Sequence, residues 1–146
     1  TSAFAQVGRQ CQHNLNYWQF GDYLGIGAGA HGKLTLHDRL LRQMRWKRPE
    51  QYLAKAAAGN PVQDEFAVPS ADLPFEFMLN ALRLIQGFDA QLFESRTSLP
   101  LFSIEHILRQ AQADGLIERA GQRIAPSDRG RRFLNRLLQR FLADRD

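Results

Sequence analysis

Residues 13–32, HNLNYWQFGDYLGIGAGAHG, concentrate the side chains of this chain that could take part in chemistry. His13 precedes an aromatic pair, Tyr17 and Trp18. A histidine in this setting could ligate haem iron while the rings lie against the porphyrin. The alternative is a loop histidine that bonds to backbone and a tryptophan that fills the core. The residue types alone leave both interpretations open.

The glycine-rich part of this segment, GAGAHG at 27–32, has the G-x-G-x-x-G spacing of dinucleotide-binding loops. That fingerprint requires a helix that begins at the loop and further strand–helix units around it. The residues that follow are KLTLHD, which carry no helix start. Close passage of backbone is therefore the favoured explanation of the glycines, and contact with a cofactor is the second.

Metal and acid–base chemistry find little support in the residue pattern. His13, His31 and His37 lack the close spacing of zinc ligands. Cys11 is the single cysteine, which excludes an intramolecular disulfide and an all-cysteine metal site. A GxSxG elbow and a close pair of carboxylates in an apolar setting are both absent from the sequence. We therefore expect no catalytic residues in this chain.

Composition and charge indicate a globular protein. The 146 residues are 44% apolar and 23% charged, without a run long enough to span a membrane or a secretory signal. The net charge of +4 is concentrated at residues 1–50, which hold seven Lys and Arg against three Asp and Glu, whereas residues 51–146 hold twelve of each. We expect a cytoplasmic location. Because the chain begins with Thr1, we also expect it to be a piece of a longer protein.

The first half of the sequence gives weak structural signals. We expect a loop over 1–21, a short buried strand over 22–26, and extended or helical chain over 33–48. Pro49 indicates the first turn of a helix that ends at Gly59. The proline-bearing stretch 60–70 is predicted to be a loop and the domain boundary.

The second half reads as helices and one hairpin. The predicted elements are a helix capped by Asp72 that ends at Gly87, a short helix over 89–95, a helix capped by Ser103, a hairpin over 116–126 with its turn at Ala120 and Gly121, and a last helix that begins at Ser127. The last helix should turn Leu134, Leu137, Leu138 and Phe141 inward and Arg132, Arg136 and Arg140 outward.

This order is typical of a winged helix, which raises DNA binding. The helix that would enter the major groove, SIEHILRQAQAD, carries Glu105 and Asp114 against Arg109. It therefore offers almost no phosphate neutralisation, and we expect no nucleic-acid partner.

The segment HNLNYWQFGDYLGIGAGAHG resembles the HN-x-x-YW…YLGIGAGAHG segment of the HemW family, radical-SAM haem chaperones that are similar to oxygen-independent coproporphyrinogen III oxidases. The likeness continues through RWKRPEQYL to GLIER…RIAPSDRGRRFLNRLL and covers essentially the whole chain. It implies a C-terminal fragment with an α+β fold. Residues 1–60 would be the end of a radical-SAM partial barrel with a connecting helix, and residues 61–146 a mainly helical, winged-helix-like domain.

The resemblance also implies a binding site. Carried over by position, the family's proposed haem-binding motif falls on His13, Asn14, Tyr17 and Trp18, with His13 as the iron ligand. A second set, Gly25, Gly27 and Gly29, would lie close to S-adenosylmethionine (SAM) in the intact protein. The C-x-x-x-C-x-x-C ligands of the family's 4Fe-4S cluster are absent from this sequence.

The function that the resemblance implies is binding of haem and its transfer to an acceptor protein, either soluble or membrane-bound. The first alternative is an enzyme of porphyrin biosynthesis, a coproporphyrinogen III dehydrogenase that uses SAM, although the chain alone would not catalyse that reaction. The second is a winged-helix module that docks on protein or DNA. A fragment without most of its barrel would expose the apolar residues of YLGIGAGA, which favours self-association.

Overall fold

The computed structural model describes residues 5, 6 and 8–143, and it confirms a mixed α+β chain. Backbone contacts divide the chain into two compact units. The described residues up to Gly21 and from Ser70 onward form unit 1, and Asp22–Pro69 form unit 2. These units reflect packing, and the division into family domains at residue 60 stays a prediction.

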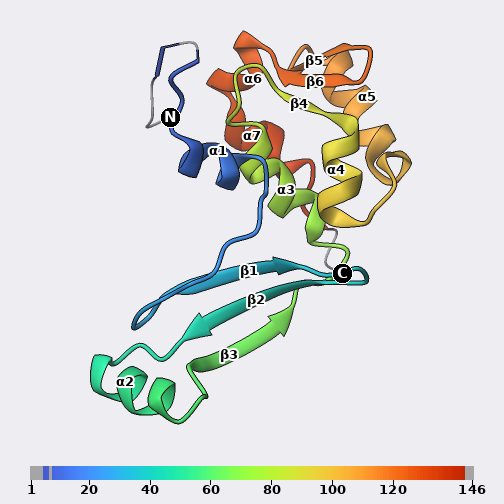
Figure 1. Ribbon diagram of the computed structural model, residues 1–146. Coiled ribbons are helices and arrows are strands. Elements are labelled where there is room, and N and C mark those ends of the chain that lie inside the picture. The colour runs from blue at the N-terminus through green and yellow to red at the C-terminus, as the bar shows by residue number, and fades with distance from the viewer. Residues whose placement is uncertain (1–4, 7, 144–146) are drawn as a thin grey trace. The chain divides into compact units, whose positions relative to one another are not determined.

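Unit 2 is a three-stranded antiparallel sheet with one helix (Figure 1). Its elements are β1 (His31–Thr35), β2 (Leu40–Arg45), α2 (Pro49–Ala57) and β3 (Val62–Ala67). The strand order is β1-β2-β3, and Leu34 lies opposite Leu41 in the first pair. The predicted ends of α2 are confirmed, since Pro49 occupies the first turn and Gly59, with φ of 77°, follows the last one.

Two predictions for unit 2 are wrong. Residues 22–26 form only one bridge, Tyr23 to Lys33, and the side chains of Leu24 and Ile26 are 67% and 86% exposed rather than buried. The stretch 60–70 holds β3 instead of a loop. Nearly every β3 residue is exposed, so the strand lacks the apolar alternation by which a half-buried strand is recognised. Residues 33–48 take the extended of the two predicted forms.

Unit 1 combines helices with a small antiparallel sheet of strand order β4-β6-β5 (Figure 1). Its elements are α1 (Gln12–Trp18), α3 (Leu73–Ala81), β4 (Phe88–Asp89), α4 (Ala90–Thr97), the 3-10 helix η1 (Leu101–Ile104), α5 (Glu105–Ala113), β5 (Ile117–Ala120), β6 (Arg123–Pro126), α6 (Asp128–Arg132) and α7 (Leu134–Gln139).

The core of unit 1 is organised around Phe77 on α3, whose side chain is fully buried. The rings of Phe20, Phe88 and Phe93 meet it edge to face, with centroids 5.7, 5.1 and 5.2 Å away. Such aromatic pairs contribute about 0.5–1.5 kcal/mol each beyond the burial of their area. These contacts connect β4, α4 and the segment after α1 to α3.

Several boundaries in unit 1 differ from the sequence predictions. The stretch around His13, predicted to be a loop, is the helix α1. Asp72 occupies the predicted N-cap position of α3, but its side chain makes no capping hydrogen bond to the helix, and the helix ends at Ala81 rather than at Gly87. The predicted cap Ser103 lies inside η1, and α5 begins after Ile104.

The last helix is also split, because the chain turns at Phe133 between α6 and α7. Ser127 caps α6 as predicted, since its side chain accepts a hydrogen bond of 3.0 Å from the Gly130 amide. The hairpin of β5 and β6 is confirmed. The winged-helix assignment and the barrel remnant stay predictions.

Candidate functional site

The four residues of the HN-x-x-YW motif all lie on α1, so the structure brings them together on one short helix. His13 and Tyr17 are one turn apart, and their ring centroids are 4.7 Å from each other at an interplanar angle of 82°. Asn14 and Trp18 have the same four-residue separation, which places them on the adjoining face. The helix therefore presents two neighbouring pairs, one with the imidazole and one with the indole.

The turn that follows α1 fixes this helix to the core of unit 1. Phe20 is 2% exposed and has a positive φ of 55°, which a bulky residue adopts only where its surroundings require it. The next residue, Gly21, donates its amide to the Asn16 carbonyl at 2.7 Å. A Cβ at position 21 would lie 2.0 Å from Asn16 Oδ1 and 2.9 Å from the Asn16 backbone oxygen, and the backbone contact favours glycine there. Sequence reasoning missed Phe20, because no local pattern marks a residue in a predicted loop as part of the core.

The His13 side chain is the exposed member of the motif, whereas Asn14, Tyr17 and Trp18 are half-buried. Among the described residues, its ring contacts Tyr17 and takes part in no hydrogen bond or ion pair. A neutral imidazole with an accessible ring nitrogen can ligate a metal centre. The arrangement therefore fits an axial ligand to haem iron, with aromatic surface beside it.

The three glycines of the second predicted site have two different structural roles. Gly25 is buried, and a Cβ there would lie 2.4 Å from the backbone oxygen of His31. It therefore allows two backbone segments to pass each other closely. Gly27 and Gly29 have φ of 107° and 71° and meet no backbone or side chain at close range, so they serve the turn. The favoured sequence interpretation, close backbone passage, describes Gly25.

The glycine turn is held by hydrogen bonds to two later residues, Tyr52 on α2 and Trp46 between β2 and α2. Gly27 donates its amide to the Tyr52 hydroxyl at 3.1 Å, and Gly29 donates to the backbone oxygen of Trp46 at 2.8 Å. The Trp46 indole N–H is buried and has no acceptor within the part of the chain that the structure describes. Lys55 Nζ lies 5.3 Å from the centroid of that ring. An unsatisfied buried donor on the residue whose backbone contacts Gly29 is a feature that a bound ligand could explain.

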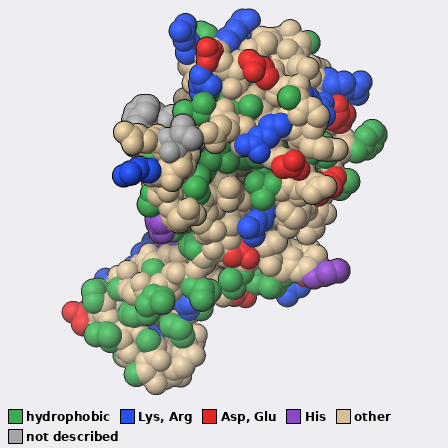
Figure 2. Space-filling model, turned by 45° about the horizontal axis from the view of Figure 1, so that its top comes forward, with side chains coloured by type: hydrophobic (Ala, Val, Ile, Leu, Met, Phe, Trp, Pro, Cys, Tyr) green, Lys and Arg blue, Asp and Glu red, His purple; other side chains and the backbone are tan. Residues whose placement is uncertain are grey.

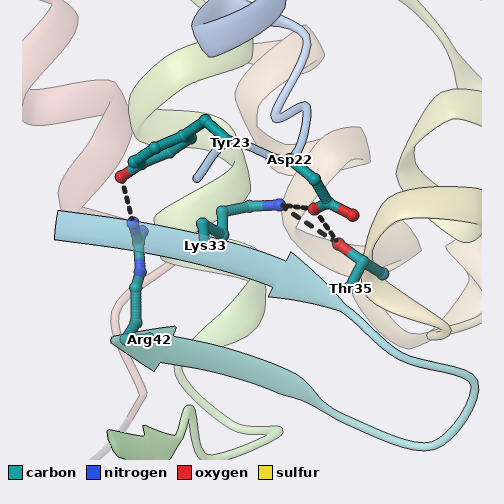
Figure 3. Close-up of polar contacts among 5 residues, drawn as sticks. All are labelled: Asp22, Tyr23, Lys33, Thr35 and Arg42. Carbon is teal, nitrogen blue, oxygen red and sulfur yellow. Dashed lines mark hydrogen bonds and ion pairs between the residues drawn. The ribbon is translucent and has the colours of Figure 1, made fainter. Parts of the chain in front are cut away.

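A polar cluster ties the segment before the glycine turn to the sheet of unit 2 (Figure 3). Lys33 is buried, and its Nζ donates to Asp22 Oδ1 at 2.9 Å and to Thr35 Oγ1 at 3.1 Å. Burial raises the pKa of Asp22, but the hydrogen bonds from Lys33 and Thr35 outweigh it and leave that pKa below its ordinary value. Beside it, Arg42 Nη1 donates to the Tyr23 hydroxyl at 3.0 Å. Sequence reasoning missed Lys33, because a lysine in a strand is usually exposed.

Comparison with known proteins tests the resemblance to the HemW family. Residues 68–133 match the family described as the HemN C-terminal domain. Over 145 residues, 99% of this chain, the sequence is 41% identical to proteins named "Heme chaperone HemW" from Escherichia coli (strain K12) and Haemophilus influenzae. The resemblance to the HemW family is confirmed. The chain spans about 37% of the length of these two HemW relatives.

More distant similarities point the same way. A protein of Dictyostelium discoideum, "Radical S-adenosyl methionine domain-containing protein 1, mitochondrial", is 28% identical over 97% of this chain and 36% of its own length. Among solved structures, the coproporphyrinogen III oxidase HemN from Escherichia coli matches with a TM-score of 0.52 and 20% identity. That match covers 83% of this chain and 28% of the oxidase and shows a shared fold.

Two features of the described residues bear on the cofactors of the HemW family. Within residues 5, 6 and 8–143, no three His, Cys, Asp or Glu side chains gather in a group that could hold a metal ion. The exposed Cys11 is the single cysteine of the chain, so these residues do not fit the three-cysteine ligand set of the family's 4Fe-4S cluster. In the same residues, no helix has the length and apolar character needed to cross a membrane.

Proposed function

We propose that this chain is the C-terminal part of a haem chaperone, which binds haem through α1 and passes it to an acceptor protein. The observation that carries the proposal is the gathering of His13, Asn14, Tyr17 and Trp18 on one short helix with the imidazole exposed. The names of the HemW relatives support it, since they describe haem chaperones. We place the intact protein in the cytoplasm.

Each motif residue has a role that follows from its position. A ring nitrogen of His13 ligates the iron, and the edge contact with Tyr17 limits rotation of the imidazole. The indole of Trp18 lies against the macrocycle, because burying its large apolar surface there stabilises the complex. Asn14, one turn before Trp18, provides a polar group beside that indole. Phe20 keeps the helix in place through its contact with Phe77.

The glycine turn would belong to a second site in the intact protein. We propose that Gly25, Gly27 and Gly29 lie close to SAM there, with the indole N–H of Trp46 as a donor to the bound molecule. The cluster ligands would come from outside this chain, since it has one cysteine. The present chain alone is therefore expected to bind haem without catalysing a radical reaction.

The main alternative is an oxygen-independent coproporphyrinogen III dehydrogenase. The fold shared with HemN is the observation that favours it. The HN-x-x-YW motif favours the chaperone, and the relatives at 41% identity carry the chaperone name. The third candidate, a winged-helix module that docks on protein or DNA, has the β5–β6 hairpin in its favour.

A haem titration followed by the Soret band tests the proposal. We expect saturable binding of one haem by the 146-residue chain and at least about tenfold weaker binding by His13→Ala, because loss of a metal ligand removes more than 1.4 kcal/mol. His37→Ala is the matched control. That histidine is also exposed, but it lies in the β1–β2 turn outside the motif.

Equal binding by the wild type and His13→Ala would remove His13 from the site. Equal losses in His13→Ala and His37→Ala would indicate nonspecific capture of haem by surface histidines. Conversion of coproporphyrinogen III by the full-length protein, without haem binding, would favour the enzyme.

A further inference from the structure

Two adjoining hollows lie where the end of α5 meets α6, α7 and the residues after them. The first, of about 450 Å³, is lined by the side chains of Arg129, Phe133, Arg136 and Arg140 and by the backbone around Gly115. The second, of about 630 Å³, includes His106, Ile107, Gln110 and Leu142. Both are lined by Ala113, Asp114 and Arg140, so they form one continuous depression, which we call the α5–α7 groove.

The groove carries an excess of positive charge. Arg140 forms an ion pair with Asp114, and Arg129 Nη1 donates to the backbone oxygen of Asp114 at 3.2 Å. Both arginines therefore contact Asp114 at the C-terminal end of α5: Arg129 satisfies its carbonyl, and Arg140 pairs with its carboxylate. Arg136 is exposed and forms no hydrogen bond or ion pair with the described residues. Support of the helix end explains Arg129 and Arg140 but leaves Arg136 without a structural role.

Each hollow also exposes one large apolar side chain. Phe133 is 53% exposed in the first hollow, and Leu142 is 51% exposed in the second. Phe133 cannot turn inward with the α7 core residues, because it occupies the turn between α6 and α7. The backbone beneath is closely packed, since a Cβ at Gly130 would lie 1.9 Å from the Leu116 oxygen. The groove is thus a firm surface that combines arginine with exposed aromatic and aliphatic side chains.

We propose that the α5–α7 groove binds an acidic, extended segment of a partner protein. Carboxylates of that segment would bond to Arg136, and its apolar side chains would cover Phe133 and Leu142. Charge complementarity selects the acidic partner, and arginines around a central aromatic are typical of the residues that dominate protein interfaces. A small anion would fill only the first hollow and leave Leu142 exposed. Nucleic acid is disfavoured because α5 carries Glu105 and is followed by its C-cap Asp114.

The proposal concerns a different part of unit 1 from the haem motif and does not depend on haem binding. Fluorescence anisotropy tests it with a fluorescein-labelled synthetic peptide of the repeat Glu-Glu-Leu-Ser. We expect Arg136→Gln to weaken binding about tenfold, the worth of one charge-assisted hydrogen bond. Arg132→Gln is the matched control, because Arg132 is also exposed, lies on α6 and lines neither hollow. It should bind within about twofold of wild type, as expected when only screened net charge changes.

The apolar contribution has its own matched pair. We expect Phe133→Ser to weaken binding, and Phe66→Ser, at a side chain that is 54% exposed in unit 2, to leave binding unchanged. The peptide repeats Gln-Gln-Leu-Ser and Glu-Glu-Ser-Ser should each bind more weakly than Glu-Glu-Leu-Ser. Thermal melts of all variants check that the fold is retained.

Several results would overturn the proposal. One is an equal effect of Arg136→Gln and Arg132→Gln, and another is the absence of any change in the anisotropy of the peptide up to about 1 mM protein, which corresponds to a Kd weaker than about 1 mM. Displacement of the peptide by inorganic phosphate, together with no effect of Phe133→Ser, would assign a small-anion site. Tighter binding of a single-stranded oligonucleotide through Arg136 would assign nucleic acid. Haem titration of Arg136→Gln should match the wild type, so this proposal and the haem proposal can fail separately.

Discussion

At the scale of single residues, two side chains occupy environments that are unusual for their types. Lys33 is buried at its pair with Asp22, and Phe20 adopts a left-handed backbone to reach the core. Both residues support a neighbouring candidate site rather than belonging to it. Phe20 anchors the helix that carries the candidate haem-binding motif, and Lys33 anchors the segment that leads to the glycine turn.

We expect substitution of Asp22 to destabilise unit 2 more than substitution of Lys33 does. Asp22→Ala leaves a buried ammonium without its carboxylate and should lower the free energy of unfolding of unit 2 by about 2 kcal/mol. Lys33→Met should cost less, because an apolar side chain of similar shape suits the buried position and the freed carboxylate, 36% exposed, can be hydrated. Urea denaturation followed by Trp46 fluorescence measures both, in a Trp18→Phe background that leaves one tryptophan. A larger loss for Lys33→Met would contradict the account.

The sequence could predict the motif residues but not the side chains that position them. The identities and spacing of His13, Tyr17 and Trp18 can be recognised in the sequence itself. The role of Phe20 depends on its contact with Phe77, which comes from a segment more than fifty positions later. The burial of Lys33 likewise depends on Asp22 and Thr35, which tertiary structure brings to its ammonium.

At the scale of elements, long-range ion pairs supplement the apolar core. Glu105 at the start of α5 accepts a hydrogen bond of 2.7 Å from Arg119 on β5. This bond is the main reason that the pKa of Glu105 lies below its ordinary value. The pair thereby connects α5 to the β5–β6 hairpin, which would be the wing of a winged helix.

This pair predicts a pH dependence of stability. Because the folded-state pKa is lowered, the contribution is fully present above the ordinary value of about 4.3 and is lost as the pH falls through the folded-state value. Glu105→Gln should therefore cost about 1 kcal/mol near neutral pH and progressively less below about pH 4. Urea denaturation between neutral and acidic pH measures the difference. Glu118→Gln, at an exposed β5 position without an ion pair among the described residues, should show no such dependence.

Elements with periodic apolar residues and clear turn signals were the predictable ones. The β5–β6 hairpin was predicted from its turn, and Gly121 indeed has φ of 59°. By contrast, α1 is polar and seven residues long, so local propensity alone does not predict it. Its helical form is supported by the tertiary contact between Phe20, just after the helix, and Phe77 on α3.

At the scale of the whole chain, unit 2 leaves much apolar surface uncovered. Its large apolar side chains that are more than a third exposed are Leu24, Ile26, Leu36, Leu53 and Phe66. Figure 2 shows apolar side chains gathered over this unit. Surfaces of this kind usually meet another protein surface. In the intact protein, we expect the part outside this chain to cover them.

The exposed apolar surface predicts self-association of the isolated chain. Sedimentation velocity should show a rise in mean mass with concentration for the wild type and a smaller rise for the double variant Leu24→Ser/Ile26→Ser. Ile85→Ser, at a 64% exposed position of unit 1, is the matched control and should behave like the wild type. Strictly monomeric wild type at all concentrations would contradict this prediction.

The central claim is that His13 ligates haem iron, and a change of ligand tests it most directly. In a Cys11→Ser background, which removes the single native thiol, His13→Cys replaces the imidazole with a thiolate donor. The absorption spectrum of the haem complex should then change from that of an imidazole-ligated haem to that of a thiolate-ligated one. An unchanged spectrum would show that the iron is held elsewhere and would contradict the account.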